Sequence, residues 1–472
     1  MHGKNFYNNT VTACADSALS QKLQAATDRQ SEARQAICEE LDDVEKFRDL
    51  AAELRNDVLS NLHSYLSRFV ENIEKAGVNV HWAKDAQEAR EIVCRLAKKH
   101  KVTSIVKSKS MITEEIGVTD ALTRDGLEVT ETDLGEFIVQ ISGQKPAHIV
   151  LPAVHLSAQE VARIFAEKID YSGEADPQLL TKAARNYLRG KFKAASMGIS
   201  GVNFAVAEQG LWVTCTNEGN GRYVMEWPKV YLAIMGIERI VQDADCAAVI
   251  LKLLARFATG QRITQYTNLV KGRSSMERPE YVHLVLLDNG RSRILASKYW
   301  QMLRCIRCGA CLNVCPVFRH IGGQCFPTCY SGPMGTVLSP LLLGLKKAGI
   351  VPKACSICGI CNQVCPVKIP LTDLLCELRN DLAESKYGSL LEKSAMNVGA
   401  FVLGHPVLYR LAQKIMRLVL LPLSKNGWVK WMPSIPGRWT KVKDLPLPSR
   451  KSFLAGKRTN NSQDTRRDSR GE

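Results

Sequence analysis

Two runs of cysteine dominate the chemistry that this sequence could perform. Residues 305–316 read CIRCGACLNVCP and residues 355–366 read CSICGICNQVCP. Both follow the spacing C-x2-C-x2-C-x3-C-P, which is typical of [4Fe–4S] ligation. Three thiolates two residues apart allow a tight loop to wrap one corner of a cubane, and the glycine allows the backbone to approach closely. The fourth cysteine of each run points away and ligates the other cluster.

This spacing predicts two interlocked [4Fe–4S] clusters. The predicted ligands are Cys305, Cys308, Cys311 and Cys365 for the first cluster, and Cys315, Cys355, Cys358 and Cys361 for the second. Structural zinc is the alternative, but it usually takes two C-x2-C pairs separated by a longer loop. Clusters that only hold the module together are a second alternative. Two clusters sharing their ligand runs favour electron transfer over that role.

The remaining cysteines carry no such spacing. Eleven of the 16 cysteines lie between Cys305 and Cys376, and in a cytoplasmic chain such density indicates metal ligation and not disulfides. Cys325 and Cys329 follow the first run, either as free structural thiols, the favoured interpretation, or as ligands of a further metal. Cys376 is expected to be a packing residue.

The cysteine runs follow a long stretch in which strands alternate with helices. After a helical stretch from about residue 16 to 76, β-branched runs predict strands at 78–82, 102–106, 128–132, 148–151, 211–216, 230–235 and 282–287. Helices are expected at 86–98, 158–168, 177–193 and 244–257. Such alternation is typical of an α/β domain around a largely parallel sheet.

Five segments follow from these changes along the chain. We expect a helical N-terminal extension that covers a sheet (1–76), an α/β domain (77–290) and an α-helical, ferredoxin-type module with two clusters (291–397). A C-terminal helix and a Pro- and Trp-rich stretch (398–455) precede a disordered basic tail (456–472). The amphipathic helix within 398–423 is expected to pack on the protein itself, with a membrane-surface helix as the alternative.

Polar residues gather where the predicted strands of the α/β domain end. Loops at the carboxyl ends of parallel strands form ligand crevices, so we expect contacts to an anionic small molecule there. The candidates are Lys107, Lys109, Ser110, Glu114, Asp133, Glu136, Asn203, Glu208 and Glu218. Each alone could equally be a helix cap or a turn residue. The sequence has no GxGxxG after a strand, no Walker motif and no nucleophile elbow.

The net charge of +16 is concentrated near the C-terminus. Residues 425–472 hold twelve Lys or Arg against four Asp or Glu, which is half of the excess. A solvated tail or a docking patch for an acidic partner is the favoured interpretation, a peripheral contact with an anionic membrane the second, and nucleic acid the least supported. With no spanning helix or signal peptide expected, we predict a cytoplasmic protein.

Several of these stretches resemble a known family. The segments KSKSMITEEIG (107–117), ETDLGEFIVQISGQKPAHIVLPAVH (131–155), GVNFAVAEQG (201–210), TNEGNGR (216–222) and VYLAIMGIERIV (230–241) are similar to the lactate-utilisation (LUD) domain. With IRCGACLNVCPVFRHIGG and YSGPMG after them, the chain resembles the B family of lactate-utilisation proteins from about residue 16 to 453.

This resemblance implies both a fold and a role. The sheet should be related to phosphosugar-isomerase and CoA-transferase folds. The chain should be the iron–sulfur electron-transfer subunit of a system that oxidises L-lactate to pyruvate and passes electrons to the respiratory chain. Its partners would be a cysteine-rich iron–sulfur protein and a smaller LUD-domain protein. Cys325 and Cys329 depart from the family pattern, and no catalytic residue carries over. The alternative is an isomerase or transferase with structural or sensory clusters.

Overall fold

The computed structural model describes residues 2–272, 279–385, 387, 390–433, 440 and 443–449. It forms two compact units, Met1–Leu382 and Ala383–Glu472. The predicted tail at 456–472 lies outside the described residues.

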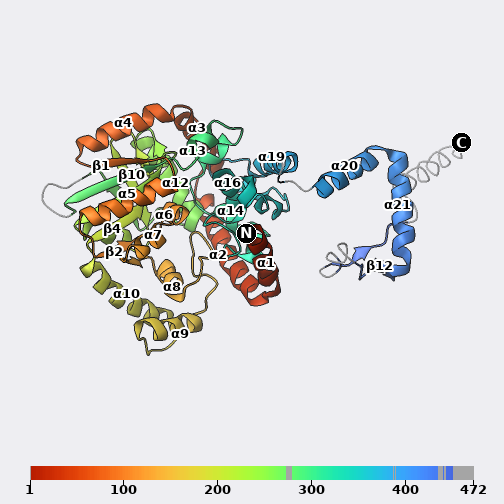
Figure 1. The fold of residues 1–472 in the computed structure, drawn as a ribbon, viewed down its shortest axis with the longest axis horizontal. Helices are drawn as coiled ribbons and strands as arrows, with labels where there is room; N and C mark the ends of the chain where they lie inside the picture. Colours follow the sequence, from red (N-terminus) through yellow and green to blue (C-terminus); the bar gives the residue numbers. More distant parts are fainter. Residues whose placement is uncertain are drawn as a thin grey trace. The chain divides into compact units, whose positions relative to one another are not determined.

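The first unit begins with helices α1 (His2–Ala15), α2 (Ser17–Glu39), α3 (Val44–Ser60) and α4 (Leu62–Lys75). Asp16 and Asp43 cap α2 and α3, accepting hydrogen bonds from the backbone N–H groups of Leu19 and Lys46. Helix α4 buries Leu62, Leu66, Phe69 and Ile73. They pack against the sheet of the α/β domain, so α4 covers that sheet, whereas α1 and α2 lie against the cysteine-rich module (Figure 1).

The central sheet is six-stranded and parallel throughout, which confirms the predicted α/β class. Its order is β1 (Asn79–Ala83), β10 (Tyr281–Leu287), β7 (Val230–Gly236), β4 (Met197–Gly201), β2 (Ser104–Lys107) and β3 (Glu128–Glu131). Alternate residues of β10 face opposite layers: Leu284 and Leu286 pack toward α4, whereas Val285 and Leu287 pack toward α5 (Ala86–Lys99). The VHLVLL run is therefore buried on both faces, as parallel strands usually are.

The structure contains the strand predicted at 211–216, in a second sheet, and lacks the one predicted at 148–151. Residues 211–216 form β6 (Leu211–Thr216) of a second sheet with β5 (Phe204–Val206), β8 (Ile240–Val241) and β9 (Tyr266–Val270). Residues 148–151 form no strand. The imidazole Nδ1 of His148 accepts the N–H groups of Val150 and Leu151, so these donors are not available to a strand partner.

Further helices lie between the strands of the α/β domain. They are α6 (Met111–Ile116), α7 (Val118–Arg124), α8 (Leu134–Ser142), α9 (Ala158–Ile169), α10 (Pro177–Ala194), α11 (Asn220–Glu226) and α12 (Ala244–Thr259). Helices α6, α7, α8 and α11 were not expected from the sequence. Helix α6 follows β2 and α8 follows β3, so both begin beside the carboxyl edge of the sheet.

The cysteine-rich module is a set of short helices. These are α13 (Arg291–Leu295), η1 (Trp300–Arg304), α14 (Ala310–Asn313), α15 (Phe318–Ile321), α16 (Gly332–Leu343), α17 (Leu345–Ala348), η2 (Val351–Lys353), α18 (Ile360–Gln363) and α19 (Leu371–Glu384). Their buried residues share one hydrophobic core with residues of α1, α3 and α12. The module is therefore built into the first unit and is not an appended ferredoxin.

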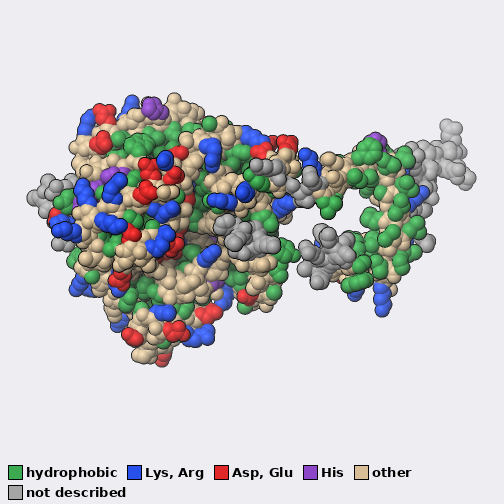
Figure 2. Space-filling model, viewed as in Figure 1, with side chains coloured by type: hydrophobic (Ala, Val, Ile, Leu, Met, Phe, Trp, Pro, Cys, Tyr) green, Lys and Arg blue, Asp and Glu red, His purple; other side chains and the backbone are tan. Residues whose placement is uncertain are grey.

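The second unit contains α20 (Leu390–Gly404), α21 (Pro406–Leu420), η3 (Leu421–Leu423) and short antiparallel strands β11 (Ser424–Lys425), β12 (Trp428–Val429) and β13 (Leu445–Pro446). Hydrophobic side chains gather along α20 and α21 (Figure 2). Those exposed include Leu391, Met396, Phe401, Val407, Leu411, Leu418 and Trp431. Within the described part of the chain, no helix is long and apolar enough to cross a membrane.

Candidate functional site

The four predicted ligands of the first cluster line one common space. Cys305 follows η1, Cys308 and Cys311 flank the start of α14, and Cys365 follows α18. All four border a small cavity that Arg307 and Met334 also line. Residues 60 positions apart therefore meet as the fourth-cysteine rule predicts.

The four predicted ligands of the second cluster are also neighbours. Burial, together with the charges of Cys355, Cys315 and Cys358, raises the pKa of the Cys361 thiol to about 12. Burial and the charges of Cys355 and Cys358 also raise the pKa of the Cys315 thiol. Four thiolates crowded in this way require positive charge between them, which the iron of a cluster would supply.

The two loops share a strained backbone that suits a cluster. Arg307 and Ile357 hold the same place in the two runs, and both have positive φ, 62° and 55°. Such a conformation is unusual for a side chain other than glycine, and rarer still for a β-branched one. At Ile357 it turns the backbone N–H toward sulfur, 3.3 Å from Cys355 Sγ. In the loop after the second run, Ile369 N lies 3.4 Å from Cys365 Sγ. Hydrogen bonds to sulfur are one of the means by which proteins tune such clusters.

In the described part of the chain, no group of three or more His, Cys, Asp or Glu side chains has the arrangement to hold a single metal ion. The first set places four thiols around one small cavity, and four thiolates are the donors that a [4Fe–4S] cluster takes. The residues present therefore fit such a cluster.

Buried arginines surround the first cysteine set, which sequence reasoning missed. Arg307, Arg55 and Arg239 all lie close enough to Cys305 to feel its charge. Burial lowers the pKa of Arg55 to about 10 and lowers that of Arg239 in spite of this charge, whereas the charge raises the pKa of Arg307 against the effect of burial. Arg307 Nη1 is buried and has no hydrogen-bond partner among the described residues. Because Arg307 also lines the cysteine cavity, this N–H can serve a bound cluster. The sequence did offer a signal for Arg307, because it is a charged residue between the predicted ligands Cys305 and Cys308.

A further arginine clamps the fourth ligand of this set. Arg48, from α3, donates to the carbonyl oxygen of Cys365 from Nε (3.1 Å) and Nη2 (2.9 Å). The N-terminal helices therefore hold one of the cysteines in place. The second set has a smaller counterpart, Arg379, whose Nη2 donates to the carbonyl oxygen of Cys355 at 2.7 Å.

Most of the predicted small-molecule contacts lie together at the carboxyl edge of the sheet. Lys107 is buried and pairs with Glu131 (2.5 Å) and Glu114 (3.0 Å). Lys109 Nζ lies 3.7 Å from Glu136 and is buried without a hydrogen bond among the described residues. The other members are Ser110, which caps α6, Asp133, which caps α8, and Glu218, which accepts from the backbone N–H of Leu134.

Two of the predicted contacts lie elsewhere. Asn203 accepts the N–H of Cys215 within the second sheet and borders a small cavity with Arg55 and Arg239. Glu208 forms an ion pair with Arg68 on α4. Both follow the β4–β5 region, whose strands belong to different sheets, so they are not part of the group at the carboxyl edge.

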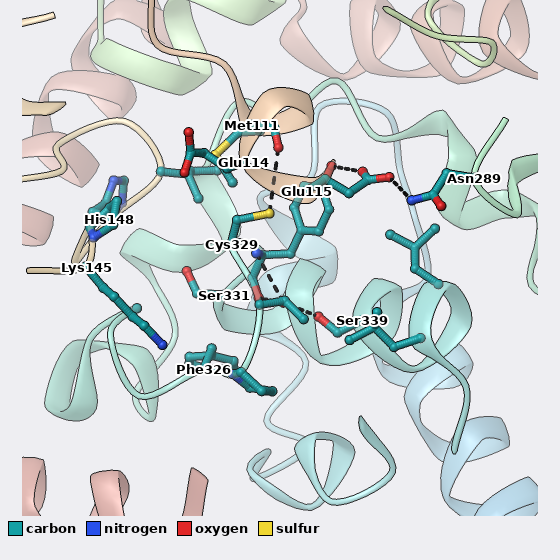
Figure 3. A pocket seen from close by; sticks show the side chains of 18 of the residues that line it. Met111, Glu114, Glu115, Lys145, His148, Asn289, Phe326, Cys329, Ser331 and Ser339 are labelled. Atoms are coloured by element: carbon teal, nitrogen blue, oxygen red, sulfur yellow. Dashed lines mark hydrogen bonds between the residues drawn. The ribbon is translucent and has the colours of Figure 1, made fainter. Parts of the chain in front are cut away.

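A cleft of about 500 Å³ lies between this edge and the cysteine-rich module. Figure 3 shows α6 on one side and the loop that carries Phe326, Cys329 and Ser331 on the other. Cys329 Sγ points toward the carbonyl oxygen of Met111, 3.7 Å away, while Cys325 Sγ donates to the Ile321 carbonyl oxygen outside the cleft lining. The sequence signal for this loop was its two additional cysteines.

Several titratable groups of the cleft have shifted pKa values, Glu136 and His148 among them. Burial raises the pKa of Glu136 to about 7, although the charge of Lys109 opposes this. Burial lowers the pKa of His148 to about 4, and the charge of Lys109 adds to that effect. Since Nδ1 of His148 accepts two backbone N–H groups, its Nε2–H donates to Oδ1 of Asn313 on α14 (2.9 Å). Titratable groups of this kind mark functional clefts.

The cleft and the first cysteine loop are joined by two side chains. The guanidinium of Arg307 stacks over the ring of Tyr330, 4.7 Å from its centre, and Tyr330 lines the cleft. The hydroxyl of Tyr330 donates to Glu115, which is also held by Arg291 at 2.8 Å. Tyr330, a residue of the cleft wall, therefore contacts Arg307, which directly precedes the predicted ligand Cys308.

Comparisons with known proteins agree with this architecture. The chain matches the LUD domain over residues 66–287, a 4Fe-4S dicluster domain over 301–369, and the C-terminal family of lactate utilisation protein B over 380–460. A DUF162 family protein from Deinococcus radiodurans, of known crystal structure, covers 48% of this chain and 98% of its own, with 13% identity and a TM-score of 0.28.

Curated relatives cover almost the whole chain. Lactate utilization protein B of Bacillus cytotoxicus is 40% identical over 453 residues, which is 95% of this chain and 96% of that protein. The proteins of the same name from Bacillus cereus and Bacillus thuringiensis match equally well, at 40% identity over the same share of each chain. The chain has a role in lactate utilisation with iron–sulfur clusters, and it belongs to the lactate utilization protein B family.

Proposed function

We propose that this chain is the iron–sulfur electron-transfer subunit of a system that oxidises L-lactate to pyruvate in the cytoplasm. The observation that carries the proposal is that the members of each predicted cysteine set lie together. Cys305, Cys308, Cys311 and Cys365 border one cavity, and Cys315, Cys355, Cys358 and Cys361 lie close enough for their charges to interact. When bound, each four-iron cluster takes up and releases one electron. Oxidation of lactate to pyruvate releases two electrons and two protons, so two clusters can receive the pair.

The residues of the chain prepare the sites for this transfer. Arg48 fixes the backbone at Cys365, and Arg307 places positive charge and a free N–H beside Cys305. The strained turn at Ile357 aims its N–H group at the sulfur of Cys355. Because Cys315 and Cys365 each belong to one run and to the opposite set, the two sites are held at a fixed separation.

The partners that fit this role are a cysteine-rich iron–sulfur protein and a smaller LUD-domain protein of the same system. We propose that electrons leave through them toward a respiratory acceptor. The basic segment 425–472 and the exposed apolar side chains of α20 and α21 also support a peripheral contact with an anionic membrane, where that acceptor would lie. No DNA-binding motif supports nucleic acid as a partner.

The test is reduction of the clusters by lactate under anaerobic conditions. We expect the purified full chain to be brown and to stay oxidised with L-lactate alone, and its visible absorbance to bleach once the partner proteins are added. Bleaching by lactate with the isolated chain would contradict the proposal, since the oxidation site would then lie in this chain.

A second candidate function rests on the cleft. Its volume is typical of small-molecule sites, and Glu136 has a pKa near neutrality, as a general acid or base would need. The LUD domain would then be an isomerase- or transferase-like enzyme with structural or sensory clusters. Turnover of a phosphosugar or CoA ester by the cluster-free variant C308A/C358A would favour this function over electron transfer.

A further inference from the structure

The two cysteine loops have nearly the same sequence but opposite exposure. Cys308 is 7% exposed and Ala310 1% exposed. At the matching positions of the second loop, Cys358 is exposed and Ile360 is 40% exposed. Spacing alone would make the two loops equivalent, so the surrounding fold has separated their environments.

The first loop is covered by the LUD domain. A Cβ atom placed on Gly309 would lie 3.2 Å from a methyl group of Val150 and 3.4 Å from Ile149. On the other side, Arg307 stacks on Tyr330. The segment 148–151, which failed to become a strand, is the part of the LUD domain that covers this loop.

The second loop carries no such cover within the first unit. A Cβ atom placed on Gly359 would meet no other atom within 4 Å. The side chains of Ile357 and Ile360 are 41% and 40% exposed, one on each side of the exposed ligand Cys358. Single exposed apolar residues are common, but a pair flanking a metal ligand marks the place where another surface could exclude water.

On the basis of the electron-transfer function above, we propose that residues 356–360 form the port at which this chain exchanges electrons with another redox protein. The partner would present a one-electron cofactor at its own surface, against Ile357, Cys358 and Ile360. In each exchange one electron passes between that cofactor and the cluster held by Cys315, Cys355, Cys358 and Cys361; one centre is oxidised, the other is reduced, and no bond is made or broken. The cluster on the first loop is the interior one, next to the cleft, and reaches the partner only through the second.

A relaxation measurement tests the exposure of the two clusters without any partner. The full chain, reduced with dithionite, is mixed with a dysprosium chelate that cannot enter the protein, and the power saturation of its EPR signals is recorded. We expect one signal to relax much faster with the chelate and the other to change little, and C358A to alter the sensitive signal. Equal sensitivity of both signals in the wild-type chain would overturn the proposal, whether or not C358A folds.

A kinetic measurement tests the port itself. The reduced full chain is oxidised by cytochrome c, a one-electron protein acceptor, in stopped flow. We expect I360K to lower the second-order rate about tenfold, because a charged side chain would disrupt the contact next to Cys358. The control I263K adds the same charge at another exposed isoleucine and should leave the rate near that of the wild type. Iron content and both reduction potentials should be unchanged in the two variants.

The outcomes separate the port from the proposed function. Equal rates for I360K and I263K, with intact clusters that still transfer electrons, would reject the port and leave the electron-transfer function standing. Clusters that are present but exchange electrons with neither dithionite nor cytochrome c would reject the electron-transfer function. A rate that depends on the square of the chain concentration would show that the occupant is a second copy of this chain, which also overturns the proposal.

Discussion

Arg307 stands between two cluster ligands and brings a positive charge into a buried place. Its guanidinium lies beside Cys305 and lines the cavity of the first cysteine set. Reduction adds negative charge to a cluster, so a nearby cation favours the reduced form and raises the potential. The second loop has Ile357 at the matching position. The two potentials should therefore respond differently to changes at these residues.

We expect R307Q to lower the reduction potential of one cluster and leave the other nearly unchanged. A unit charge about 7 Å away, at an effective dielectric constant near 20, is worth about 2 kcal/mol, or about 100 mV for one electron. A fall of about 50–100 mV in an EPR-monitored redox titration is the expected result. R307K keeps the charge and should restore most of the potential. Equal potentials in R307Q and the wild type would show that the charge does not act on the cluster.

Glu136 is the other residue with a testable charge state. Burial raises its pKa to about 7, from an ordinary value of 4.5. Between these values the folded chain keeps a proton that the unfolded chain releases, so folding becomes less favourable as the pH rises through this window, by up to about 3 kcal/mol. The variant E136Q has no titrating group at this position, so its folding stability does not fall with pH for this reason.

We therefore expect the melting temperature of E136Q to rise relative to wild type between pH 5 and pH 8. The exposed Glu167 on α9 provides a matched control, because E167Q should show no such trend. A difference between E136Q and wild type that stays constant with pH would mean that Glu136 is already ionised at pH 5.

At the scale of elements, sequence periodicity recovered most of the central sheet but not all of it. Strand β4 reads MGISG, whose two glycines and serine give little β signal, yet it pairs with β2 and β7 in the middle of the sheet. The run HIVL at 148–151 has the opposite character. Its composition is that of a strand, but Pro146 precedes it and Pro152 follows it. The imidazole of His148 accepts two of its backbone N–H groups, which are then not available to a neighbouring strand.

The cysteine sets could be predicted because spacing determines which thiolates can share a cluster. The exposure of the two loops could not, because it depends on contacts with Ile149 and Val150, which lie more than 150 residues before Gly309. The cleft was anticipated only in part. Glu114 and Glu136 were predicted from residues near strand ends, whereas Tyr330 and Cys329 come from the other module.

Gly309 and Gly359 offer a matched pair that tests this packing. Both have positive φ, 82° and 81°, so alanine would be strained at either position by about 1–2 kcal/mol. Only at Gly309 would the new methyl group also press on Val150. We expect G309A to lose iron faster and to melt at a lower temperature than G359A. Equal losses in the two variants would show that the LUD domain does not constrain the first loop.

On the scale of the whole molecule, the first unit joins the LUD domain and the cysteine-rich module through one core, and the second unit displays apolar side chains on helices. The second unit also contains the basic segment 425–472. Apolar and basic side chains in one segment are typical of a peripheral membrane contact. Such a contact would hold the chain near a respiratory acceptor.

We expect the full chain to sediment with vesicles that contain anionic lipid, and less so at high salt. The double variant L411E/L418E should lose most of this binding, because both leucines are exposed on α21. The control I263E/L269E adds the same charges at exposed residues of the first unit. Vesicle binding by L411E/L418E equal to that of this control would rule out α21 as the contact.

The central claim is that each cysteine set holds a four-iron cluster that carries one electron. It is tested most directly by counting iron and acid-labile sulfide in the anaerobically purified full chain, with an EPR spectrum before and after reduction with dithionite. We predict about eight irons and eight sulfides per chain, and two signals that appear only on reduction. Zinc in place of iron, or four irons and a single signal, would contradict the account.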